Sequence, residues 1–411
     1  MSGLRGRRGG SPGFSGTSGG SAVLHATRNN HRLRSVIVLG SSGLLSATAL
    51  MATAAPTVAS AQEAARMTGA CVTHTAARIG HIGGIVHARS TRASCAATPR
   101  PGDLAIGTPP LLYHGGAVMG TASTGPVVIT PIFWNPTGHP MAAIYKTIVS
   151  QYLLDVMAAS LTPTNVFSTL PEYGGSNGTI RYAIVRTPVL SDPRPLPASG
   201  CTVAPADATG IYSDGTGYDW CLSDAQLQAE IDSVINAFGL KRDNGHLYVI
   251  FLPKHVESCY LPGSTTTSLN SCTLNHQPSA AYCAYHSKGT SGTIYANLPY
   301  PAYHSNTGYT CSSDKNYGTV ESPNNNPDAD TEVSPTSHEI SEAITDPDVS
   351  TGWYDSTGYE NGDECAYVYG ATVGNAGALY NQTINGHHFL TQEEFSNQDW
   401  SLTGGGCLQH H

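Results

Sequence analysis

Charged side chains are scarce in this chain of 411 residues. Asp, Glu, Lys and Arg together make up 12% of it, which is about half the share found in an average soluble protein. The polar surface must therefore come mainly from uncharged residues, a composition typical of secreted proteins. Beyond the first 61 residues, no segment has the ~20 apolar residues that a membrane span needs, so we expect no membrane insertion of the mature chain.

Lys and Arg are absent from Asn316 to His411, although the same stretch carries fifteen acids. Acids on the surface stay solvated, but a buried carboxylate needs a cation or a set of hydrogen-bond donors because desolvation is costly. Since no Lys or Arg lies nearby in the sequence, a bound metal ion is the simplest compensation. The composition therefore favours a metal site in the C-terminal quarter.

Residues 1–61 form a leader of a different composition, with six arginines and no acid. An apolar stretch from Val36 to Ala55 is followed by Ala59-Ser60-Ala61. A basic segment, an apolar core and an Ala-x-Ala site are typical of a cleaved signal peptide; an uncleaved N-terminal anchor is the alternative. Cleavage would leave 14 basic residues against 29 acids, which argues against nucleic acid as a partner.

Ten cysteines follow the leader, and none forms a Cys-x-x-Cys pair. An even number in an exported protein predicts disulfide bonds rather than a thiolate metal site. Proximity in the sequence suggests the pairs Cys201–Cys221 and Cys365–Cys407. In an oxidising compartment Cys283 is a disulfide partner rather than a nucleophile, whereas the nearby His286 is free to line a cleft.

The distribution of apolar residues along the chain predicts a pro-segment or flexible arm at 62–108. It predicts one α+β domain at 109–411, with a mixed sheet packed on helices. A capping box of Ser223 and Gln226, followed by Gly239, gives the clearest helix signal. The expected helices are Met141–Ala159, Asp224–Phe238 and a third from near Pro335 to just before Pro347. The expected strands are Val127–Trp134, Ile180–Val185, Leu247–Pro253 and Thr293–Leu298.

The third of these helices carries the candidate site. Ser334 is a suitable N-cap, and Pro335 suits the first helical position. His338 and Glu342 are then one turn apart on one face, where an imidazole nitrogen and a carboxylate oxygen can bind one ion. Glu339 lies beside them, where it can hold a water and take its proton, as in His-Glu-x-x-His metallopeptidases.

A third ligand would come from the next acidic motif, in which Glu360 and Asp363 are the candidates. Asp346 is a turn residue or a supporting acid, and one of His387 and His388 is a further candidate. Because Glu342 replaces the second histidine of the metallopeptidase motif, calcium or manganese is an alternative to zinc. Exposed helices also carry such runs by chance.

Motifs between Leu111 and Cys407 resemble those of one family. They are Tyr113-His114-Gly115-Gly116, Ile132-Phe133-Trp134, His338-Glu339-x-x-Glu342-x-x-Thr345-Asp346-Pro347, Glu360-x-Gly362-Asp363-x-Cys365 and the tail from Asn381 to Cys407. Together they resemble the Exordium, or phosphate-induced, family of secreted plant proteins and its microbial relatives. The resemblance implies an extracellular protein with a zincin-like fold, related to zinc metallopeptidases. It also implies metal ligands at His338, Glu342 and Asp363 and a catalytic Glu339.

Two functions are consistent with these patterns. The first is a secreted zinc-dependent hydrolase, most simply a peptidase acting on protein or peptide, in which Glu339 activates a water. The second is a non-catalytic extracellular protein that binds cell-wall polymer and keeps a structural metal site, as the association of plant members with the cell wall implies. The glutamate at position 342 favours the second function, whereas the intact Glu339 favours the first. We expect a monomer in either case.

Overall fold

The computed structural model describes residues 109–200, 220–260, 272–273, 282–301, 311 and 322–411, and the backbone of short strands at 82–87, 303–304 and 308–309. The predicted signal peptide, most of the predicted pro-segment and Cys201 lie outside the described residues. Among the described residues, no helix is both long and apolar enough to cross a membrane.

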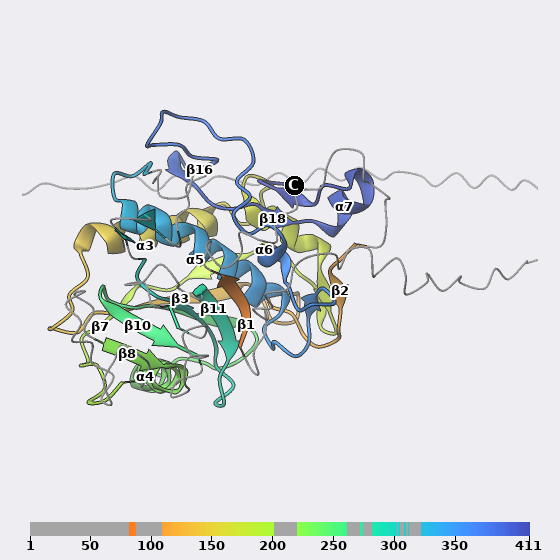
Figure 1. The fold of residues 1–411 in the computed structure, drawn as a ribbon. Helices are drawn as coiled ribbons and strands as arrows, with labels where there is room; N and C mark the ends of the chain where they lie inside the picture. The colour runs from red at the N-terminus through yellow and green to blue at the C-terminus, as the bar shows by residue number, and fades with distance from the viewer. Residues whose placement is uncertain are drawn as a thin grey trace, which may run out of the picture. The chain divides into compact units, whose positions relative to one another are not determined.

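A mixed sheet of seven strands forms the centre of the fold (Figure 1). Its order is β1-β11-β12-β9-β3-β6, and β7 also pairs with β3. Strands β12, β9, β3, β6 and β7 are parallel, whereas β11 is antiparallel to β12 and β1 is antiparallel to β11. The bounds of these strands are β1 Ile82–His87, β3 Val127–Trp134, β6 Ile184–Arg186, β7 Leu190–Asp192, β9 His246–Phe251, β11 Tyr282–Lys288 and β12 Ile294–Leu298.

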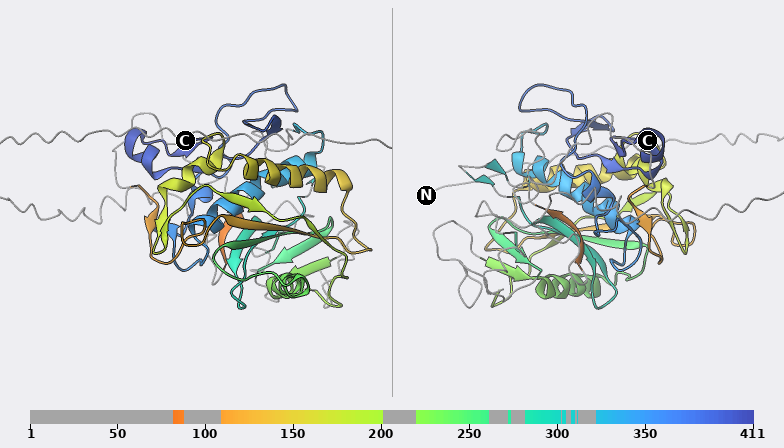
Figure 2. Two further views of the ribbon diagram at one scale, coloured as in Figure 1. Left: turned by 180° about the vertical axis from the view of Figure 1, so that it is seen from behind. Right: turned by 45° about the vertical axis from the view of Figure 1, so that its right-hand side comes forward.

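Helices cover both faces of the sheet (Figure 2). Along β9, Leu247, Val249 and Phe251 face the core under α3 and α5, while Tyr248 and Ile250 face α4, as the alternation of strand side chains requires. The helices are α3 Ala143–Ala158, the 3-10 helix η1 Val166–Glu172, α4 Asp224–Phe238, α5 Pro327–Thr345, α6 Asn361–Glu364 and α7 Asn397–Thr403. The α+β class and the packing of a mixed sheet on helices are thus as predicted.

Short two-stranded ladders complete the described part of the fold. Their strands are β2 Leu112–Tyr113, β4 Gly174–Gly175, β5 Gly178–Thr179, β8 Trp220–Ser223, β10 Val256–Cys259, β13 Tyr303–His304, β14 Gly308–Tyr309, β15 Trp353–Tyr354, β16 Gln382–Ile384, β17 His387–Phe389, β18 Glu394–Phe395 and β19 Cys407–Leu408.

Local signals predicted several elements closely. Strand β3 has the predicted bounds, and α4 has its capping box and a left-handed Gly239 at φ 62°. The strand predicted at Ile180–Val185 was placed too early. Ile180 and Tyr182 are buried in the core, but the ladder begins only at Ile184, because the alternation reflects packing of a loop. Strand β11, Tyr282–Lys288, is not among the strands expected from the sequence.

The start of α5 was also predicted wrongly. The helix begins at Pro327, and the side chain of Asn326 caps it by accepting a hydrogen bond of 2.9 Å from the amide of Ala329. Ser334 is therefore not an N-cap, and Pro335 lies inside the helix. Both prolines follow a capping residue, so the local signals at the two places are alike. Tertiary packing decides between them, because α5 is buried from Ala329 onwards.

Three disulfide bonds are described: Cys259–Cys272, Cys283–Cys311 and Cys365–Cys407. The predicted pair Cys365–Cys407 is confirmed, and it joins the end of α6 to β19. Cys283 is a disulfide partner as expected, which excludes a nucleophilic role for it. The predicted partner of Cys221 lies outside the described residues.

Glu332 on α5 is a buried acid whose raised pKa makes the stability of the fold depend on pH. Burial, together with the charge of Asp328, raises the pKa of Glu332 to about 8, although the hydroxyl of Tyr145 donates a hydrogen bond of 2.9 Å to it. Between the ordinary pKa of a glutamate and about 8, Glu332 is therefore protonated in the folded state and ionised in the unfolded state. The free energy of unfolding falls as the pH rises through this range. We expect Glu332→Gln to raise the melting temperature relative to the wild type at pH 8 and far less at pH 5.

The matched control is Tyr145→Phe, which removes the hydrogen-bond donor. It should steepen the loss of stability with pH, since the charged carboxylate then has less support. Melting temperatures measured between pH 5 and pH 8 test both variants. A gain from Glu332→Gln that is the same at every pH would contradict this assignment.

Candidate metal centre

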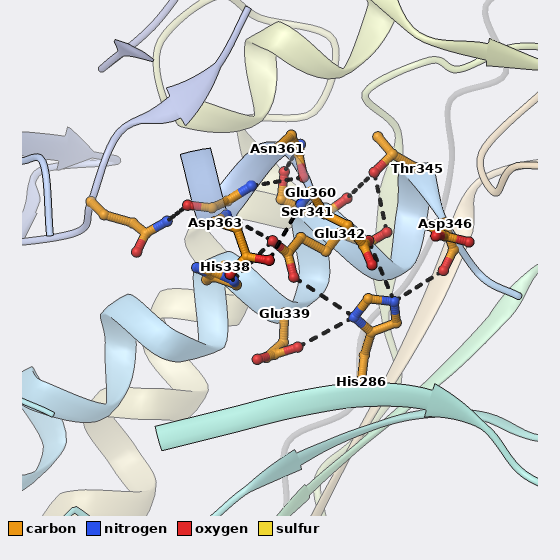
Figure 3. Close-up of polar contacts among 12 residues, drawn as sticks. His286, His338, Glu339, Ser341, Glu342, Thr345, Asp346, Glu360, Asn361 and Asp363 are labelled. Atoms are coloured by element: carbon orange, nitrogen blue, oxygen red, sulfur yellow. Dashed lines mark hydrogen bonds and ion pairs between the residues drawn. The ribbon is translucent and has the colours of Figure 1, made fainter. Parts of the chain in front are cut away.

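Helix α5 presents three of the four predicted site residues to the space between itself and the sheet (Figure 3). His338, Glu339 and Glu342 are fully buried. His338 and Glu342 lie one turn apart, and the His338 Nε2 atom is 2.9 Å from Glu342 Oε1. The helix thus places a nitrogen and an oxygen donor side by side, as the spacing in the sequence predicts.

Asp363 comes from the short helix α6 and joins this pair. Its Oδ1 atom lies 3.7 Å from His338 Nε2, and its backbone amide donates a hydrogen bond of 2.9 Å to Glu342 Oε1. One donor atom from each of His338, Glu342 and Asp363 lies within 4.8 Å of the others. Zinc bonds of about 2.0–2.1 Å to nitrogen and oxygen place tetrahedral ligand atoms about 3.3 Å apart. The three side chains therefore fit an ion of this size.

A second group lies against the first and shares Glu342 with it. His286 on β11 has its Nδ1 atom 3.4 Å from Glu339 Oε2 and 3.8 Å from Glu342 Oε2. The Nε2 atom of His286 lies 3.0 Å from the carbonyl oxygen of Asp346. A carbonyl only accepts, so Nε2 carries the proton in this contact and Nδ1 is the atom that faces the two carboxylates. Glu339 therefore points at His286 (Figure 3).

The basic groups that face the carboxylates of this cluster are histidines. In the described parts of the chain, no Lys or Arg forms an ion pair with Glu339, Glu342 or Glu394. Neither carboxylate oxygen of Glu339 has a hydrogen-bond partner among the described residues. Burial, followed by the charges of Glu342 and Asp363, raises the pKa of Glu339 well above its ordinary value. Burial likewise raises the pKa of Glu394. Without an ion, Glu339 and Glu394 therefore keep their protons more readily than exposed glutamates do.

His338 provides positive charge in the same state. Burial lowers its pKa, but the carboxylates of Glu342, Asp363 and Glu394 outweigh burial and raise it to about 9. Without an ion, the imidazole is therefore protonated at neutral pH. A divalent cation at His338 would replace this proton, which is the usual coupling between metal binding and proton release.

Of the remaining candidate residues, Glu360 and Asp346 lie beside the cluster, whereas His387 and His388 lie elsewhere. Glu360 caps α6, and its Oε2 atom is 3.7 Å from His286 Nε2. Asp346 is the buried C-cap of α5. His387 pairs with Asp155 at 2.8 Å, and the ring of His388 stacks on Tyr380, so neither belongs to the two groups.

The sequence did not predict that His286 would lie in the site, against Glu339. The stretch Tyr282–Lys288 contains two tyrosines with strong strand preference, and this signal would have placed His286 on a buried strand.

Comparison with known proteins gives no assignment. No family model matches this chain, and neither a curated protein nor a solved structure matches it. Function is therefore inferred from the site.

Gly362 allows α6 to approach α5 closely enough to complete the first group. A Cβ atom at this position would lie 2.8 Å from His338 Cγ and 3.0 Å from Glu342 Oε1, closer than buried atoms tolerate. We expect Gly362→Ala to push α6 and Asp363 away from His338, and to lower the melting temperature by several degrees, as for a loss of about 1–3 kcal/mol.

Gly138→Ala is the matched control, because a Cβ atom there meets nothing within 4 Å. Thermal unfolding with and without added zinc tests both variants. Zinc should raise the melting temperatures of the wild type and of Gly138→Ala by similar amounts, and that of Gly362→Ala by less. Equal shifts in both variants would contradict the placement of Asp363 in the metal group.

Proposed function

We propose that this protein is a secreted zinc-dependent hydrolase that cleaves peptide bonds. The observation that carries the proposal is the position of Glu339. It is fully buried, its two oxygens have no hydrogen-bond partner among the described residues, and it adjoins the ligands on its own helix. A metal site that is only structural has no need of such an acid.

His338, Glu342 and Asp363 would hold the ion. One nitrogen and two carboxylate donors suit zinc, whereas calcium prefers oxygen ligands alone. Zinc supplies polarisation of a carbonyl group and lowers the pKa of water. Glu339 holds the attacking water and takes its proton, and its raised pKa makes it a stronger base than an exposed glutamate. His286 positions Glu339 through the contact of 3.4 Å.

The proposal includes the family and the location. A chain with the Exordium-like motifs, a zincin-like arrangement of sheet and helix, and a leader resembling a signal peptide would act outside the cell. The three described disulfide bonds support an oxidising compartment.

A second candidate is a non-catalytic extracellular protein with a structural metal ion. Burial favours it, because His286, His338, Glu339 and Glu342 are all fully buried and Asp363 is only 1% exposed. In this case a chelator would lower the melting temperature, and no peptide would be hydrolysed under any condition.

Substitution of the proposed base separates the two candidates. We expect Glu339→Gln to keep the fold and the metal and to lose peptide hydrolysis by at least ~100-fold, the smaller end of what general base catalysis contributes. The control is Glu364→Gln on α6, which is half-buried and outside both groups. Hydrolysis of a quenched fluorescent peptide library by the zinc-loaded protein measures the effect.

Unchanged hydrolysis by Glu339→Gln would contradict the mechanism. Zinc-loaded wild-type protein that melts at a lower temperature after chelation, yet cleaves no peptide, would favour the second candidate instead.

A further inference from the structure

A polar pocket lies between α3 and β17, and it shares no residue with the candidate metal centre. Its volume is about 230 Å³. The lining residues come from α3, from the chain before α5 and from β17: Thr147, Ile148, Gln151, Asn324, His387 and Phe389. His387 is thus a candidate ligand from the sequence that lies in a pocket of its own.

A buried acid orients the imidazole of His387. Thr147, Gln151 and Asp155 follow one another at intervals of four residues on α3, so they share one face of the helix. Asp155 is only 2% exposed, and its Oδ2 atom lies 2.8 Å from the Nδ1 atom of His387. A carboxylate accepts hydrogen bonds, so Nδ1 carries the proton. The Nε2 atom of the neutral ring is therefore an acceptor.

Two side-chain amides of the pocket are oriented in the same way. The Nε2 atom of Gln151 donates a hydrogen bond of 2.9 Å to Asp155 Oδ1. The Nδ2 atom of Asn324 donates to Asp330 Oδ1 at 2.6 Å and to the carbonyl of His388 at 3.0 Å. Because all three partners are acceptors, the network fixes which atom of each amide is the nitrogen. The amide oxygens have no hydrogen-bond partner within the described parts of the chain.

The pocket therefore offers hydrogen-bond acceptors and few donors. The acceptors are the side-chain oxygens of Gln151 and Asn324 and the Nε2 atom of His387. No Lys or Arg is among the described residues that line it. The buried carboxylates of Asp155 and Asp330 each lie one hydrogen bond behind these acceptors, so the pocket favours a positive charge.

We propose that this pocket binds a primary alkylammonium group, which a lysine side chain of a peptide or a free polyamine would carry. An ammonium has three donors and no acceptor, and it matches the three acceptors in number and in charge. Ile148 and Phe389 form an apolar wall for the carbon chain. An anion would leave the acceptors unpaired and would meet the carboxylates. This binding is independent of the proposed hydrolysis.

The first test is calorimetric titration of the full exported chain with pentylamine hydrochloride and with pentanol. Both probes have the same carbon chain, but the alcohol has one donor and no charge. We expect pentylammonium to bind at least ~10-fold more tightly, because hydrogen bonds from a charged donor are the stronger ones. Equal affinity for the two probes would overturn the proposal.

Thr147→Lys places a tethered ammonium at the exposed rim of the pocket. It should weaken the binding of pentylammonium at least ~10-fold through competition and repulsion. The matched control is Ala237→Lys, which adds the same charge at an exposed position of α4, on the other face of the sheet. The control should bind as the wild type does. Equal affinity in the two variants would place the amine elsewhere and overturn the proposal.

Long-range proton–nitrogen NMR of the histidine rings keeps the proposal testable if Thr147→Lys does not fold. In the wild type, the ring of His387 should carry its proton on Nδ1, and pentylammonium should shift its Nε2 resonance. His387→Asn, which keeps an amide donor for Asp155, assigns that resonance by its absence. A resonance that does not move at saturating pentylammonium would contradict the site.

Two further probes distinguish the sources of the ammonium group. Tighter binding of Nα-acetyl-lysine amide than of cadaverine would support the site and identify a peptide as the ligand. The reverse order would support the site and identify a polyamine. Binding of neither probe would overturn the proposal. All these measurements record binding alone, so their outcome does not depend on hydrolysis at the metal centre.

Discussion

Five buried acids meet two buried histidines between α5, α6, β11 and β18, in surroundings where the sequence from Asn316 onwards has no Lys or Arg. The acids are Glu339, Glu342, Glu360, Asp363 and Glu394. Each carboxylate that loses water without gaining a cation costs several kcal/mol or keeps a proton instead. One divalent ion at His338 would remove much of this cost. Charge compensation is therefore the condition on which the packing of α5 against α6 depends.

The sheet and helices meet this condition through backbone geometry. Helix α5 brings His338, Glu339 and Glu342 onto adjacent positions, the close approach of α6 at Gly362 adds Asp363, and β11 adds His286 from the sheet. The disulfide that follows α6 fixes this short helix to β19. Polar side chains on a buried helix need partners, and a metal ion bound by His338, Glu342 and Asp363 would supply one.

Much of the site was predictable because it is local. The His338–Glu342 spacing depends only on helical geometry, and Asp363 follows in the next acidic motif. His286 was not placed, because its contact with Glu339 joins a strand and a helix that are distant in the sequence. The predicted start of α5 was wrong because Asn326 and Ser334 both precede a proline, and tertiary packing decides which of them caps the helix. The pairs Cys259–Cys272 and Cys283–Cys311 depend on the fold as well, whereas Cys365–Cys407 was found from proximity.

Metal content measures the central claim most directly. Elemental analysis of the exported, dialysed protein should find about one zinc per chain, as one three-ligand site requires, and His338→Ala should lose it. X-ray absorption at the zinc edge should show nitrogen and oxygen neighbours and no sulfur. Wild-type protein that is folded at neutral pH and holds no divalent metal would contradict the account, because the buried acids would then be compensated without an ion.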